Sequence, residues 1–132
     1  MKELSEKYRL VHQIPTADEY KKIRSSTGWE ELDIETIKKG LDSSLFAVSI
    51  YFKDKLIGFG RVIGDGAVYF YIQDIIIKPK YQGEGLGRII MEEIMNYIKI
   101  AADNNSFIGL MAAEGVEEFY HKFGFKTRPS SK

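Results

Sequence analysis

The sequence predicts one α/β domain in which a mixed, mostly antiparallel sheet of about six strands is flanked by helices. The expected elements follow the order β-α-α-β-β-β-α-β-α-β, and a run of strands followed by one buried crossover helix is typical of a mixed sheet covered on both sides. The 132 residues fit a single domain, and the 44% of hydrophobic residues is enough for a packed core. We therefore expect residues 1–132 to form one domain.

The first third of the chain predicts a short strand and two helices. Tyr8 to His12 is typical of a short strand. Thr16 is followed three residues later by Glu19, which is the spacing of a capping box at a helix start. Asp33 can cap a second helix, whose apolar residues share one face at positions 34, 37 and 41.

Three strands are expected in the middle of the chain. Leu45 to Phe52 and Leu56 to Ile63 flank a short charged segment, which indicates a hairpin. Ala67 to Ile77 follows a Gly-Asp-Gly turn and contains only two polar residues, Gln73 and Asp74. Such a composition is typical of a strand that is buried on both faces.

The last third predicts two helices and two strands. Apolar residues from Leu86 to Ala101 recur at intervals of three and four, as on one buried face of a helix. Phe107 to Ala112 is expected to form a short buried strand, and Gly115 to Lys122 a short helix. Gly124 is placed to end that helix, and Phe125 opens a final strand.

The composition narrows the classes of function. Nineteen basic residues balance nineteen acidic ones, so no overall field favours nucleic acid or an anionic membrane as a partner. The chain has no cysteine and two isolated histidines, so we expect no metal site. The charged N-terminus lacks the apolar run of a secretory signal, and no stretch approaches the ~20 apolar residues of a membrane span. We expect a cytoplasmic protein.

The segment from Gln82 to Arg88 is the most informative about function. Its three glycines alternate at a helix start, where unpaired N–H groups and the positive end of the helix dipole favour an anion such as a pyrophosphate. A glycine-rich turn that merely caps the helix is the competing interpretation. A Walker loop would require Lys-Ser/Thr after Gly87, and a dinucleotide fingerprint would place its first glycine directly after the strand, so neither pattern fits.

Two motifs resemble those of the GNAT acetyltransferase superfamily. Gln82, Gly85 and Gly87 match the family's coenzyme A motif, Gln/Arg-x-x-Gly-x-Gly/Ala after a long strand. The segment from Phe119 to Phe125 is similar to the family's Phe-Tyr-x-Lys-x-Gly-Phe segment, and the order of elements matches as well. One departure is Ala113, because many members carry at this position an asparagine that helps to hold the cofactor.

The resemblance implies an N-acetyltransferase that uses acetyl-CoA and transfers the acetyl group by direct attack of an amine in a ternary complex. In such enzymes a bulge frees backbone groups of the strand before the loop, and these bind the pantetheine arm like an added strand. Ordinary core packing of the strand side chains is compatible with that role. The implied cofactor-binding residues are Ile75, Ile76, Ile77, Gln82, Gly83, Glu84, Gly85, Leu86, Gly87 and Arg88.

The resemblance also implies a general acid and leaves the base open. Tyr120 matches the family's acid, and a phenol with a pKa near 10 stays protonated at neutral pH; a core tyrosine is the alternative. Family members often use a glutamate as the base, but Gln73 stands at that position. Asp74 is the nearest carboxylate, with a structural hydrogen-bonding role as its alternative. Weaker candidates are a water relay, His12, Glu31 and Asp33.

The acceptor is expected to be the primary amine of a small molecule. Trp29, in the loop after the first helix, and Tyr71, on the long strand, are candidate substrate-binding residues, because aromatic rings suit an apolar or aromatic amine or a cation. Packing in the core is the competing interpretation for both. Glycine followed by Trp29 also resembles relatives that acetylate arylalkylamines.

Two other functions stay open. Ala113 and Gln73 favour a non-catalytic acyl-CoA-binding or regulatory domain, whereas Tyr120 favours an enzyme. Peptide or protein N-acetylation is the other alternative, because the fold serves both classes of acceptor. The chain ends soon after Phe125, where family members usually have a further strand, so a second copy that completes the sheet edge is one partner we consider.

Overall fold

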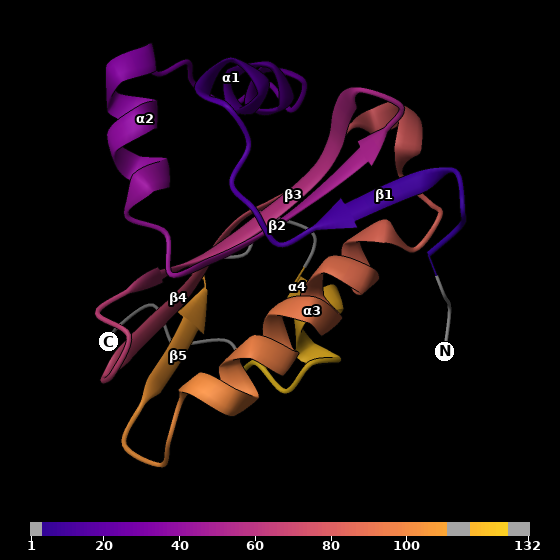
Figure 1. Ribbon diagram of the computed structural model, residues 1–132. Helices are drawn as coiled ribbons and strands as arrows, with labels where there is room; N and C mark the ends of the chain where they lie inside the picture. Colours follow the sequence, from indigo (N-terminus) through magenta and orange to yellow (C-terminus); the bar gives the residue numbers. More distant parts are fainter. Residues whose placement is uncertain (1–3, 111–116, 127–132) are drawn as a thin grey trace.

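The computed structural model describes residues 4–110 and 117–126, and its centre is one five-stranded sheet (Figure 1). Along the sheet the strands are β1 (Tyr8–Val11), β2 (Phe46–Phe52), β3 (Lys55–Gly64), β4 (Tyr69–Ile77) and β5 (Phe107–Leu110). The first four pair antiparallel to their neighbours, whereas β4 and β5 are parallel. The structure thus confirms a mixed, mostly antiparallel sheet.

Helices cover both faces of this sheet. They are α1 (Ala17–Ser25), α2 (Ile34–Asp42), α3 (Leu86–Ala101) and α4 (Glu117–His121), with a short 3-10 helix η1 (Pro79–Tyr81) before α3. In Figure 1, α1 and α2 lie on one face and α3 and α4 on the other. The order of helices and strands is the predicted one as far as α4.

The first two helices begin where the sequence predicts. The hydroxyl of Thr16 accepts a hydrogen bond from the Glu19 backbone N–H at 3.1 Å, and the Glu19 carboxylate accepts one from the Thr16 N–H at 2.9 Å. This is a complete capping box, which satisfies two N–H groups that the helix itself cannot. Asp33 caps α2 by accepting from the backbone N–H groups of Glu35 and Thr36.

Two hydrophobic clusters hold the layers together. On the α3 face, Ile90, Met91 and Ile94 have no exposed surface and pack on the strands. On the other face, the buried residues of α1 and α2 pack around Phe59 and Ile76. In β4 the even-numbered residues from Phe70 to Ile76 are buried, whereas the odd-numbered ones are half-buried and Tyr69 is exposed. The burial on both faces that the apolar sequence of β4 predicts is therefore only partial.

A β-bulge interrupts the regular pairing of β4 with β3. Phe59 pairs with Ile76 and Arg61 with Gln73, so the single residue between them on β3 faces two residues of β4, Asp74 and Ile75. The extra residue reverses the alternation of side chains: the even-numbered residues Phe70 and Ile72 face α3 before the bulge, and Ile75 and Ile77 face it afterwards. Asp74 itself has φ = 60°.

Two details differ from the prediction. The described residues form five strands rather than about six: Phe125 is not in a strand, and residues 127–132 lie outside the described part of the chain. The long strand begins at Tyr69 instead of Ala67. The reason is the Asp65 carboxylate, which accepts hydrogen bonds from three consecutive N–H groups, those of residues 67 to 69, and so holds them in a turn.

Candidate functional site

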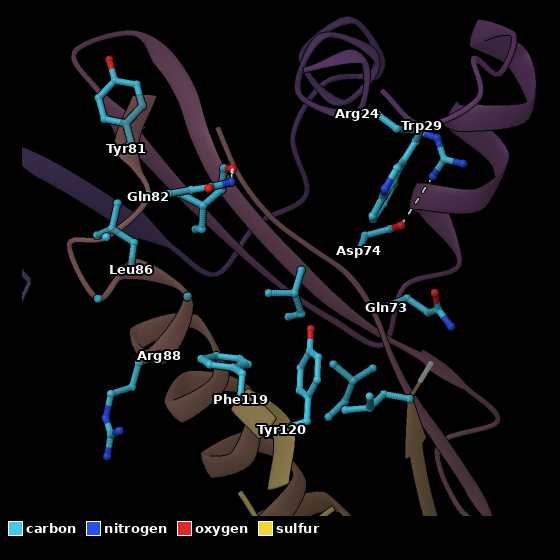
Figure 2. A pocket seen from close by; sticks show the side chains of 17 residues that line it. Arg24, Trp29, Gln73, Asp74, Tyr81, Gln82, Leu86, Arg88, Phe119 and Tyr120 are labelled. Atoms are coloured by element: carbon cyan, nitrogen blue, oxygen red, sulfur yellow. Dashed lines mark hydrogen bonds and ion pairs between the residues drawn. The ribbon is translucent and has the colours of Figure 1, made fainter. Parts of the chain in front are cut away.

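A cavity of about 750 Å³ lies between the bulged half of β4, the glycine-rich loop and α4 (Figure 2). The loop and the first turn of α3 line one end of it. Trp29 and Arg24, from the region of α1, line the other end, and Tyr120 of α4 points into the cavity between them. Segments far apart in the sequence therefore meet at one concave surface, as is typical of ligand sites.

The edge of β4 that faces the cavity has backbone N–H and C=O groups that pair with no described strand. β5 pairs with β4 only from Tyr69 to Ile72, and no described strand pairs with this edge from Gln73 to Ile77. An extended ligand with amide groups can add to such an edge as a further strand would. Ile75 and Ile77 line the cavity, whereas the side chain of Ile76 is buried against α1 and α2.

The glycine-rich loop presents free N–H groups to the cavity. Gly83 and Gly85 have φ values of 86° and 83°, a conformation in which residues with a side chain are strained. Gly85 is the N-cap of α3 and provides no side-chain cap, so the first N–H groups of the helix remain available for an anion. A Cβ built at Gly83 would meet no atom within 4 Å, so this approach is open. The loop thus fits a pyrophosphate.

Two side chains of the loop stabilise it instead of pointing freely into the cavity. The amide of Gln82 donates a hydrogen bond to the Ile77 carbonyl at 3.0 Å, which ties the loop to the end of β4. The Glu84 carboxylate accepts from the Tyr8 hydroxyl at 2.7 Å and lies 3.8 Å from the Lys7 ammonium, so it is directed toward β1. Leu86, Gly87 and Arg88 all line the cavity.

Tyr120 has the environment expected of a protonated phenol. Its ring packs against Phe119 with centroids 5.0 Å apart, and both residues line the cavity. Burial raises the pKa of Tyr120 above the usual value for a tyrosine. The hydroxyl is therefore protonated at neutral pH and can donate a proton into the cavity. Ala113, which departs from the family's motif, lies outside the described residues.

Asp74 is the centre of a charged network beneath the cavity. Its Oδ2 accepts hydrogen bonds from the Tyr20 hydroxyl and from Nε of Arg61, both at 2.8 Å. Its Oδ1 lies 3.6 Å from Nη1 of Arg24. The side chain of Asp74 is only 7% exposed, and two guanidinium groups compensate its charge.

The other end of the cavity combines an arginine and an indole ring. The guanidinium of Arg24 lies 5.2 Å from the ring centroid of Trp29, and its Nε donates to the Glu30 carbonyl at 3.2 Å. Of the two aromatic residues predicted for the acceptor, Trp29 lines the cavity but Tyr71 does not. The Tyr71 ring instead lies over Gly109 of β5.

Besides Gln73, which the sequence excluded only as a base, sequence reasoning overlooked five residues that line the cavity: Arg24, Ile72, Leu110, Tyr81 and Phe119. Tyr81 directly precedes the Gln82 motif and Phe119 begins the Tyr120 segment, so their positions next to these motifs were a usable signal. The signal for Arg24 was weaker: it lies one helical turn after Tyr20, whose hydroxyl accepts a hydrogen bond from Arg24 Nη1 at 3.2 Å.

The chain belongs to the GNAT acetyltransferase family. Residues 16–132 match the family model described as an acetyltransferase (GNAT) domain. The match includes the glycine-rich loop, both halves of β4 and the Tyr120 segment, and the cavity described above is where these parts meet. The chain is therefore an acetyltransferase.

Individual relatives agree with the family. An uncharacterized ycf52-like N-acetyltransferase of Prochlorococcus marinus is 35% identical over 123 residues, which cover 89% of this chain and 67% of the relative. A crystal structure from meticillin-resistant Staphylococcus aureus, described as a probable acetyltransferase, is 39% identical with a TM-score of 0.89 and covers 95% of this chain and 94% of that one. A chloroplastic serotonin N-acetyltransferase of rice is 33% identical over 75 residues, which cover 57% of this chain and 36% of the relative.

Within residues 4–110 and 117–126, no three His, Cys, Asp or Glu side chains cluster in a way that could hold a metal ion. No helix in the same ranges is long and apolar enough to cross a bilayer.

Proposed function

We propose that the chain transfers the acetyl group of acetyl-CoA to the primary amine of a small molecule, by direct attack in a ternary complex. The observation that supports this most is the arrangement of one cavity: the glycine-rich loop lines one end, Trp29 and Arg24 the other, and Tyr120 points in between. Both reactants can thus occupy the cavity at the same time, with a proton donor beside them.

Acetyl-CoA supplies an activated acetyl group as a thioester. The uncapped N-terminus of α3 would hold its pyrophosphate, and the free edge of β4 would pair with the amide groups of its pantetheine arm. Because the Ile77 carbonyl already accepts from Gln82, the N–H and C=O groups nearer the bulge are the ones available for that pairing.

Tyr120 is proposed as the general acid. When the amine nitrogen forms its bond to the acetyl carbon, the carbon–sulfur bond breaks and the sulfur leaves with the electron pair. The phenol of Tyr120 then donates its proton to the sulfur, so that a neutral thiol leaves. The raised pKa of this phenol keeps the proton available across the neutral range.

Asp74, the base suggested by the sequence, is proposed to position the strand. Its Oδ2 is occupied by Tyr20 and Arg61, and its Oδ1 lies toward Arg24, which leaves little capacity to accept a proton from an amine. We therefore favour water as the acceptor of the amine proton. The Asp74 carboxylate would act indirectly, by holding the bulge that opens β4 to the cavity.

The proposal is tested by measuring release of free thiol from acetyl-CoA in the presence of a panel of small primary amines. Amine-dependent release with formation of the N-acetyl product is expected. Tyr120→Phe should lower kcat by at least about tenfold with little change in coenzyme A affinity. Tyr97→Phe is the matched control, because the Tyr97 ring stacks on Phe46 outside the cavity and its loss of a hydroxyl should leave kcat unchanged.

Other outcomes would favour the other functions. Saturable coenzyme A binding without turnover of any amine would indicate a binding or regulatory domain. Acetylation of a lysine peptide in preference to every small amine would indicate a protein acetyltransferase. A Tyr120→Phe variant as active as the unmodified chain would remove Tyr120 from the mechanism.

Three further expectations remain proposals. They are that residues 1–132 form a single domain, that the chain forms a homodimer and that it works in the cytoplasm. The ycf52 relatives of Gracilaria tenuistipitata and Porphyra purpurea are matched over 60% and 65% of their own length, so the chain spans less than two thirds of those proteins. The rice relative is named as chloroplastic.

A further inference from the structure

The end of the cavity that Arg24 and Trp29 line is called here the acceptor end, and it carries an excess of positive charge. Among the described residues that line the cavity, Asp74 is the only carboxylate, and its charge is already compensated by Arg61 at 2.8 Å. Arg24, which lines the same cavity, is a second guanidinium beside that one carboxylate. A site built for an amine with no other charge would not need this arrangement, because an arginine repels the ammonium form of such a substrate.

The Arg24 guanidinium still has hydrogen-bond donors available. Its Nε donates to the Glu30 carbonyl and its Nη1 to the Tyr20 hydroxyl, whereas Nη2 makes no hydrogen bond with any described residue. The side chain is 20% exposed. Nη2 can therefore donate a charge-assisted hydrogen bond to a carboxylate oxygen of a ligand.

Trp29 holds this guanidinium and adds an apolar surface beside it. The two groups are 5.2 Å apart, and Figure 2 shows both side chains on the same side of the cavity as Asp74. Trp29 is 37% exposed, which leaves part of its ring available to a ligand.

We propose that the acceptor is a free amino acid with an apolar side chain. Arg24 binds its carboxylate, Trp29 contacts its side chain, and its amine is directed toward Tyr120. This inference rests on the proposed function, because it specifies the amine that the same cavity acetylates. Arg24 is then the residue that determines specificity. The neutralised Asp74 cannot repel the incoming carboxylate as a free carboxylate would.

Three compounds with one skeleton test the proposal: phenylalanine, phenylalanine amide and phenethylamine. The amide replaces the carboxylate by a neutral group and also stands in for the N-terminus of a peptide. Phenethylamine lacks the group altogether and stands in for arylalkylamines such as serotonin. A charge-assisted carboxylate contact should give phenylalanine a kcat/KM at least about tenfold above each of the other two.

Arg24→Gln should reduce this preference to a ratio near one, and Arg24→Lys should retain part of it, because lysine keeps the charge but loses the planar fork. Arg9→Gln is the matched control: Arg9 is exposed on β1 and does not line the cavity, so removing its charge should leave the ratio unchanged. Circular dichroism of each variant would show that it is folded.

The outcomes separate this inference from the function on which it depends. If no amine stimulates thiol release, the proposed function fails. If amines are acetylated but phenethylamine or phenylalanine amide is as good as phenylalanine, only the inference is overturned. If Arg24→Gln lowers the rates for all three compounds equally, Arg24 has a structural role through Asp74 and Tyr20, and the inference is again overturned.

Discussion

At the scale of single residues, Asp74 adopts φ = 60° in the middle of a strand, a conformation that costs about 1–3 kcal/mol in residues other than glycine. Three side chains from other parts of the chain, those of Tyr20, Arg24 and Arg61, surround its carboxylate. These contacts explain how the unfavourable conformation persists. Asp74 is therefore part of the bulge in β4, and its ion pairs with Arg24 and Arg61 determine the charge at the acceptor end of the cavity.

The hydrogen bond from Tyr20 to Asp74 gives a prediction about pH. Burial, followed by the nearby Asp74 charge, raises the pKa of Tyr20 above its usual value near 10. Because the folded pKa is the higher one, this stabilisation is fully present below about pH 10 and is lost as the pH rises through the folded pKa. Tyr20→Phe should cost about 1–3 kcal/mol at pH 8, since it removes one of the two hydrogen bonds that the buried Oδ2 of Asp74 accepts.

The difference in the free energy of unfolding between the unmodified chain and Tyr20→Phe should then become smaller above about pH 10. Urea denaturation of both proteins at pH 8 and pH 10.5 would measure this difference. The pKa values of Tyr8 and Tyr51 are also raised, to about 12 in each case, but both residues are present in both proteins, so their titration cancels in the difference. A difference that stays constant or grows with pH would contradict this reasoning.

The sequence identified some site residues and missed others for a physical reason. Gln82 and Tyr120 lie in short motifs whose spacing is fixed along the chain, so their place in the cavity follows from local structure. Arg24 has no such motif. Its position depends on how α1 and the loop after it meet β4, which is a long-range contact that periodicity does not encode. Tyr71 is the converse case, since its aromatic character alone did not show which surface it faces.

At the scale of elements, the packing of α3 on the sheet depends on glycines in β3. A Cβ built at Gly60 would lie 2.6 Å from Cγ2 of Ile90 and 2.7 Å from Cδ1 of Ile75. At Gly58 the shortest distance would be 3.0 Å, to Cδ1 of Ile77. Both glycines let α3 approach the sheet closely, but Gly60, opposite the bulge, has less space.

Gly60→Ala should therefore destabilise the protein by about 1–3 kcal/mol, because the two isoleucine side chains must leave their preferred positions. Gly58→Ala is the matched control, and we expect it to cost clearly less. Thermal or urea unfolding of both variants would measure the difference. An equal or smaller cost at Gly60 would show that α3 can move away from the sheet without penalty.

Elements defined by local signals were predicted well. The capping residues Thr16 and Asp33 mark the starts of α1 and α2, and the regular apolar spacing of α3 gives both of its ends. The family resemblance implied a bulge in this strand, but its position at Asp74 and the short pairing of β5 were not predictable from local signals. Both depend on the register between strands, which is set by partners distant in sequence.

At the scale of the whole molecule, the cavity lies where the sheet opens between β4 and β5. One wall is built by β4 and the start of α3, and the other includes Leu110 at the end of β5 and Tyr120 of α4. Beyond Ile72 no described backbone pairing joins these two walls. A ligand that contacts both would connect them, so binding should stabilise the folded chain as a whole.

Coenzyme A should accordingly raise the melting temperature. At a hundred times its Kd, a ligand that binds only the folded state contributes about 2.7 kcal/mol. For a chain of 132 residues this corresponds to a shift of roughly 10 °C, which differential scanning fluorimetry would detect. Pantetheine, which lacks the pyrophosphate, should give a much smaller shift at the same concentration, because the loop and the N-terminus of α3 would have no anion to bind.

Gly85→Val provides the control for the loop. Valine is strained at φ = 83° and brings a branched side chain to the N-cap of α3, so the shift caused by coenzyme A should be largely lost. The measured quantity is the change on adding ligand, so a lower melting temperature of the variant alone does not affect the comparison. If pantetheine and coenzyme A gave equal shifts, or if Gly85→Val responded fully, the pyrophosphate would have to bind elsewhere, and the strand edge of β4 would carry most of the affinity.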